Sequence, residues 1–154
     1  MAAAVAGGPS SGAQRMTVMQ SQSITTKNLV IYAVAGLGAW LNGAVSFRLG
    51  GKMLFENGPL IAGVSAIGIA VAVCLVLRFA MAWRKAPDTQ AVTIAVIMAL
   101  PGLFGEAARQ VVFHWATGMS GAEQPAFAAS IFFGNAVLLT YAVVKARRAQ
   151  QPTG

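Results

Sequence analysis

Four long runs of apolar residues divide the chain, and short polar connectors separate them. The runs cover residues 28–47, 60–77, 91–105 and 127–144. A helix needs about 20 apolar residues to cross roughly 30 Å of hydrocarbon. The first, second and fourth runs are long enough by themselves. The third run is shorter, and it qualifies only if its helix continues through the polar segment that follows.

The pattern predicts an all-α fold: a polytopic transmembrane helix bundle of four spans, forming one compact unit over residues 28–145. Prolines at positions 59, 87 and 125 favour helix boundaries in the connectors. The main alternative is three spans with a re-entrant third segment. The predicted spans are residues 28–48, 60–83, 91–115 and 126–145.

The two ends of the chain are predicted to lie outside the bundle. Residues 1–27 are small and polar, without the charged start and apolar core of a secretory signal. We expect them to form a disordered N-terminal tail, in which Met16 and Met19 are alternative translation starts. Residues 146–154 form a basic C-terminal tail.

Composition supports the membrane interpretation. The chain is 56% hydrophobic and 10% charged, with a mean hydropathy of +0.66, whereas soluble domains carry about 25% charged residues. The net charge of +7 comes from basic residues dispersed between the apolar runs, as the positive-inside rule predicts. This distribution argues against a nucleic-acid partner.

The distribution of Lys and Arg predicts the topology. The two tails and the connector after the second run, with nearby Arg78, hold eight of these residues, whereas the first connector holds only Arg48 and Lys52. Basic residues favour the cytoplasmic side. We therefore expect a bacterial inner-membrane protein with both termini in the cytoplasm.

The third helix carries the candidate ligand or ion-pair site. Helical spacing places Glu106, Arg109 and Gln110 on one face, with His114 at its margin. Charged residues inside a membrane usually pair, and Glu106 has two candidate partners, Arg109 on the same helix and Arg48 on the first. The pair is interpreted as structural, as part of a ligand or proton pathway, or as side chains that reach the outer interface.

Three further polar residues have alternative interpretations. His114 is either a proton acceptor or a partly exposed interfacial residue. Asn42 and Asn135 lie near the middle of the first and fourth runs. In lipid their amides need partners, so we expect hydrogen bonds between helices, with a substrate path as the alternative.

No motif indicates an enzyme. The single Cys74 excludes an internal disulfide, and the single His114 excludes a metal site built from several histidines of one chain. No nucleophile motif, phosphate-binding loop or zinc motif is present in the sequence. We therefore predict no catalytic residue, no metal site and no cofactor.

The chain resembles a known family in two segments, AWLNGAVSFRLGG and GLFGEAARQ. In this layout it resembles small four-helix bacterial membrane proteins that form a family of unknown function, which implies four helices and no established activity. Small multidrug exporters are similar in length and helix number. They rely on a glutamate in the first helix, however, whereas Glu106 lies in the third.

Three functions remain open. The favoured one is a non-enzymatic accessory or assembly subunit of a membrane complex, in which a buried Glu/Arg ion pair on the first and third helices fixes helix register. The alternative is a small homo-oligomeric transporter that uses Glu106 as a proton- or ligand-linked carboxylate. A membrane enzyme acting on a lipid or quinone is the third. The expected partners are the lipid bilayer and either further copies or other membrane subunits.

Overall fold

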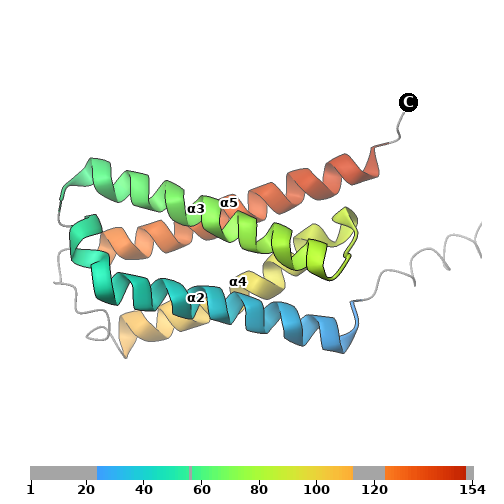
Figure 1. Ribbon diagram of the computed structural model, residues 1–154, viewed down its shortest axis with the longest axis horizontal. Coiled ribbons are helices and arrows are strands. Elements are labelled where there is room, and N and C mark those ends of the chain that lie inside the picture. The colour runs from blue at the N-terminus through green and yellow to red at the C-terminus, as the bar shows by residue number, and fades with distance from the viewer. Residues whose placement is uncertain (1–23, 56, 113–123, 152–154) are drawn as a thin grey trace, which may run out of the picture.

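A computed structural model describes residues 24–55, 57–112 and 124–151 of the chain. This part contains four long helices and one short 3₁₀ helix, and no strand (Figure 1). The elements are α2 (Thr26–Phe55), α3 (Pro59–Trp83), η1 (Asp88–Gln90), α4 (Ala91–Val111) and α5 (Gln124–Gln150). The prediction of an all-helical fold is confirmed.

The shorter third run forms a helix as complete as the others. With η1, α4 extends over Asp88–Val111, continues through Pro101 and includes Glu106. Its length and mean hydropathy are sufficient for a membrane span, as are those of α2, α3 and α5. The structure therefore supports four candidate spans rather than three and a re-entrant segment.

The helices run up and down in the order of the sequence. Consequently the start of α2, the connection between α3 and α4, and the end of α5 lie at one end of the bundle (Figure 1). Helix α2 packs mainly on α4, and α3 mainly on α5, while α4 and α5 join the two pairs. Contact between α2 and α3 is sparser, so the ring of helices is most weakly closed there.

Local sequence explains where α3 begins. Gly58 has a φ of 96°, a conformation that glycine adopts without strain, and Pro59 follows as the first residue of the helix. Pro87 in turn has an extended backbone immediately before η1. The connectors therefore end and start helices where the prolines predicted.

Glycines set the distance between α2 and α4. A Cβ atom on Gly36 would lie 2.0 Å from the backbone oxygen of Met98. The side chain of Trp40, one turn further along α2, packs on Gly102 and Gly105 of α4. These three glycines allow the two backbones to approach closely, with one indole filling the space beside them.

The largest buried cluster lies on α4 and its neighbours. Ile94 and Ala95 of α4 are fully buried, and they pack in one cluster with Leu77 of α3, Leu138 of α5 and Tyr32 of α2. All four long helices therefore contribute to one core.

Polar contacts tie the helices together at the end where the described chain begins and finishes. Arg84 donates hydrogen bonds to the side-chain oxygen of Asn28, with an Nη2 to Oδ1 distance of 2.6 Å. Lys145 Nζ lies 2.7 Å from Asp88 Oδ1, joining the end of α5 to η1. Both contacts link residues remote in sequence at the edge of the apolar region.

Candidate functional site

Glu106 and Arg109 form a buried ion pair near the end of α4. They lie three positions apart, so helical geometry places their side chains on the same face. The relative exposure of their side chains is 0% and 4%, respectively. Arg109 Nη2 donates to Glu106 Oε1 over 2.5 Å, and Arg109 Nε lies 3.0 Å from Oε2. The carboxylate is thus held by two nitrogens of one guanidinium group.

Gln110 completes this network from the next position. Its Nε2 atom donates to Glu106 Oε1 over 3.2 Å, and the side chain is partly buried. The structure therefore brings together three of the predicted site residues, Glu106, Arg109 and Gln110, on one helix. The two opposite charges make the cluster neutral as a whole, which lowers the cost of burying it.

An aromatic ring covers the guanidinium group, and a second ring contacts the first. Arg109 Cζ lies 4.7 Å from the centre of the Phe127 ring, a cation–π contact between α4 and α5. Phe127 in turn meets Phe47 of α2 edge to face, with 4.4 Å between ring centres. Both rings are buried. Arg109 therefore connects α4 to α5 and, through the two rings, to α2.

One donor of this buried cluster is unsatisfied. Arg109 Nη1 is buried and has no hydrogen-bond partner in the described part of the chain. Buried N–H groups are nearly always paired, because an unpaired one costs about 1–3 kcal/mol. The network is consequently satisfied on the Glu106 side and incomplete on the far side of the guanidinium group.

The remaining charged candidates lie elsewhere. Arg48 is exposed on α2 and has contacts of its own. The Glu106 carboxylate contacts Arg109 and Gln110, both in α4. Of the two predicted partners of Glu106, Arg109 is thus the one that forms the ion pair. His114 lies outside the described residues, so its predicted role as a proton acceptor or interfacial residue stays a prediction.

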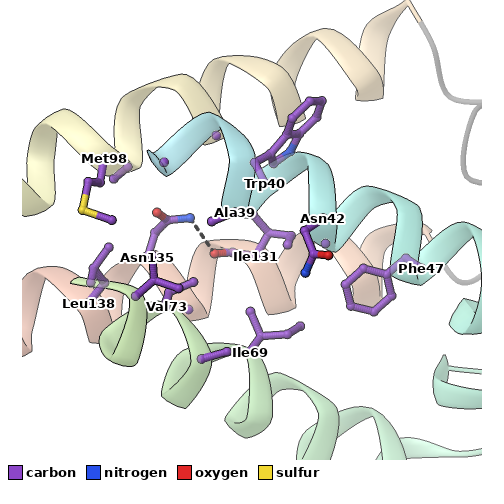
Figure 2. A pocket seen from close by; sticks show the side chains of 17 residues that line it. Ala39, Trp40, Asn42, Phe47, Ile69, Val73, Met98, Ile131, Asn135 and Leu138 are labelled. Carbon is purple, nitrogen blue, oxygen red and sulfur yellow. Dashed lines mark hydrogen bonds between the residues drawn. The ribbon is translucent and has the colours of Figure 1, made fainter. Parts of the chain in front are cut away.

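A cavity of about 200 Å³ lies between the four long helices (Figure 2). Asn42 and Asn135 both line it, from α2 and α5. The Nδ2 atom of Asn135 donates to the carbonyl oxygen of Ile131 in its own helix, over 2.9 Å. The side chain of Asn42 is exposed, and its amide makes no hydrogen bond to any described residue. The two asparagines thus meet at one cavity, and neither bridges two described helices.

Apolar side chains form most of the rest of this cavity. Phe47 lines it from α2 and Met98 from α4, and Trp40 borders it with its indole turned toward α4 (Figure 2). No charged side chain lines it among the residues described. The cavity is therefore suited to an uncharged molecule and not to an ion.

The described part of the chain offers groups for binding and packing. Within the described ranges, no group of three or more His, Cys, Asp or Glu side chains lies close enough to hold a metal ion. Glu106, the buried carboxylate of the described residues, is bound by Arg109 and Gln110. The described structure thus contains a neutral ion pair with one unpaired donor, Arg109 Nη1, and a separate, mostly apolar cavity.

Sequence reasoning missed the role of Phe127 and the cavity itself. Phe127 stood at the start of the fourth apolar run with no feature to distinguish it from other apolar residues. The close approach of α2 to α4 at Gly36 was also not predicted, although Gly36, Trp40 and Gly43 have helical spacing. Glycine beside tryptophan on one helix face is the sequence signal that indicates this close approach.

Comparisons with known proteins place the chain in a family. No curated protein and no solved structure matches it. The profile of the family of unknown function DUF5367 matches residues 53–149, which include α3, α4 and α5. The match contains Glu106, Arg109 and Asn135 and leaves out most of α2. It covers more than half of the chain and confirms the resemblance to a family of unknown function; the chain therefore belongs to the DUF5367 family.

Proposed function

We propose that this chain is a non-enzymatic accessory or assembly subunit of a membrane complex, lying in the bacterial inner membrane with both termini in the cytoplasm. The observation that carries the proposal is that the four long helices are buried within the chain to different extents. Only 11% of the apolar window of α2 and of α3 is buried within the chain, against 39% for α4 and 33% for α5. The outer faces of α2 and α3 are thus open to lipid and to other helices.

Glycines on these outer faces support a protein partner. A Cβ atom on Gly38 of α2, or on Gly63 or Gly68 of α3, would meet nothing within 4 Å. Small residues allow another membrane helix to approach closely, whereas contact with lipid chains requires no glycine. The partner helices are therefore proposed to pack on α2 and α3.

The buried ion pair supports a structural role for Glu106. A carboxylate that carries protons or ligands must exchange them with water, whereas Glu106 is 0% exposed and is hydrogen-bonded by Arg109 and Gln110. In the proposal, the pair fixes the end of α4 against Phe127 of α5, so that the bundle offers partners a single defined surface.

Native mass spectrometry of the chain, extracted gently from its own membrane, tests the accessory role. We expect foreign subunits in a fixed ratio to the chain. Ile67→Trp on the outer face of α3 should lower their yield, whereas Phe104→Trp, at an exposed position of α4, is the matched control. A monomer, or an oligomer of this chain alone, would refute the accessory role.

The cavity favours one second candidate, a small homo-oligomeric transporter of uncharged solutes. Its test is the release of a neutral fluorescent dye from proteoliposomes. Gly43 lines the cavity and Gly38 does not, yet both have room for a larger side chain. Gly43→Leu should stop release and Gly38→Leu should not. Equal release from both variants, or none from the unsubstituted chain, would exclude this candidate. No described geometry supports the third candidate, a membrane enzyme.

A further inference from the structure

The amide of Asn42 differs from five other polar side chains of the helices. Four hydroxyl side chains each donate to the carbonyl oxygen four residues earlier, so they are satisfied within their own helix: Ser46, Ser65, Ser130 and Thr140. Asn135 does the same through Ile131. Asn42 alone among these residues leaves its side chain without such a bond, and it lines the cavity.

An unpaired amide is costly in the middle of a membrane bundle. Asn42 lies near the centre of α2, within a helix long and apolar enough to cross a bilayer. Hydrocarbon supplies no hydrogen bonds, so such an amide needs a partner from another molecule or from water. Asn135 adds a second donor and an acceptor, because its hydrogen bond to Ile131 uses one of the two Nδ2 hydrogens and leaves the other hydrogen and Oδ1 available. The cavity therefore presents both donors and acceptors.

The size and lining of the cavity restrict what could bind. A dry cavity of about 150 Å³ in another protein accommodates benzene. The present cavity, of about 200 Å³, therefore has room for one ring with small substituents. Phe47 supplies an aromatic wall, and Met98 an adaptable one. Because the described lining holds no charge, a charged head group would lose its hydration without compensation.

A second hollow lies next to this cavity. An apolar groove of about 360 Å³ lies between α2 and α3 and is lined by Val34, Phe79 and Trp83, among others. Val76 lines both the groove and the cavity, so the two adjoin. Their common boundary lies where the ring of helices is most weakly closed. A molecule whose ring occupies the cavity could thus lay an apolar tail in the groove.

We propose that this cavity binds an uncharged, ring-bearing lipid of the quinone kind. The amides of Asn42 and Asn135 donate to its carbonyl oxygens or accept from its hydroxyl groups, Phe47 and Met98 border its ring, and the groove between α2 and α3 holds its alkyl or isoprenoid tail. The proposal concerns binding, without redox chemistry, and it does not depend on the accessory role.

The test measures binding of a decyl-substituted benzoquinone to the full chain in phospholipid nanodiscs, by native mass spectrometry. Gly43→Leu should abolish binding, because a side chain there enters the cavity lining, whereas Gly38→Leu should leave it unchanged. Asn42→Leu and Asn135→Leu should each weaken binding about three- to ten-fold, the effect of losing one hydrogen bond. Ser65→Ala is the control for loss of a polar group outside the cavity.

Three outcomes would overturn the proposal. The first is equal binding to the Gly43→Leu and Gly38→Leu variants, which would place the quinone elsewhere. The second is equal binding of decylbenzene, which lacks the carbonyl oxygens that the amides would recognise. The third is a second copy or a foreign helix held at Asn42, with no quinone bound. Circular dichroism of the Gly43→Leu variant verifies that its helices remain formed.

Discussion

Gly36 of α2 lies directly against the backbone carbonyl of Met98 in α4, so closely that a Cβ atom would fall 2.0 Å from that oxygen. No rotation of a side chain can relieve such a contact, because both the Cβ position and the carbonyl are fixed by the backbone. Gly36→Ala therefore requires α2 and α4 to move apart.

We expect Gly36→Ala to lower the free energy of unfolding by about 3 kcal/mol, at the upper end of the usual cost of overpacking. Reversible unfolding in mixed detergent micelles measures it. Gly38→Ala is the matched control, because its Cβ meets nothing within 4 Å and alanine favours helices by about 1 kcal/mol over glycine. Equal stability of the two variants would show that α2 and α4 do not approach at Gly36.

Glu106→Gln should destabilise the bundle strongly, because it leaves the guanidinium group of Arg109 buried without its counter-charge. Breaking a buried pair in this way costs about 3–5 kcal/mol. Asp88→Asn removes the carboxylate of the exposed contact with Lys145, and surface pairs contribute only about 0–1 kcal/mol. Thermal unfolding of the two variants should separate them clearly.

The double variant Glu106→Gln/Arg109→Met tests the reason for that loss. If the cost comes from the uncompensated charge of Arg109, removal of this charge should restore most of the stability. A double variant less stable than Glu106→Gln alone would instead show that Arg109 stabilises the bundle by itself, through Phe127 and its packing.

Phe127→Ala should be among the most damaging apolar substitutions in the chain. The ring is 1% exposed, covers Arg109 and meets Phe47. Loss of a buried phenylalanine costs about 3–5 kcal/mol. Phe132→Ala, on the same helix but 55% exposed, is the control. Thermal unfolding with a similar midpoint for both variants would contradict the role given to Phe127.

The predicted orientation can be tested by cysteine labelling. With Cys74→Ala as background, Asn57→Cys lies in the connector between α2 and α3, and Gln151→Cys lies beyond α5. Both positions are exposed and lie at opposite ends of the bundle. An impermeant maleimide added to intact cells should label Asn57→Cys alone, and should label Gln151→Cys after permeabilisation. The reverse pattern would place both termini outside.

The sequence was sufficient for the helices and for placing Glu106, Arg109 and Gln110 on one face, for one physical reason: both depend on spacing along the chain. Runs of apolar residues predict helices that could cross a membrane, and prolines mark their starts. The pairing of Glu106 with Arg109 or Arg48 was anticipated from the need of a buried charge for a partner. Spacing also placed Gln110 on their face, since residues three and four apart are neighbours on any helix.

Only the tertiary structure decided which helices meet. It paired α2 with α4 and α3 with α5, put Gly36 against Met98, and covered Arg109 with Phe127. It also chose Arg109 over Arg48 as the partner of Glu106, and brought Asn42 and Asn135 to one cavity. In a chain where every helix is apolar on most of its faces, periodicity does not distinguish a face that contacts lipid from one that contacts protein. The fit between side chains of different helices makes that choice.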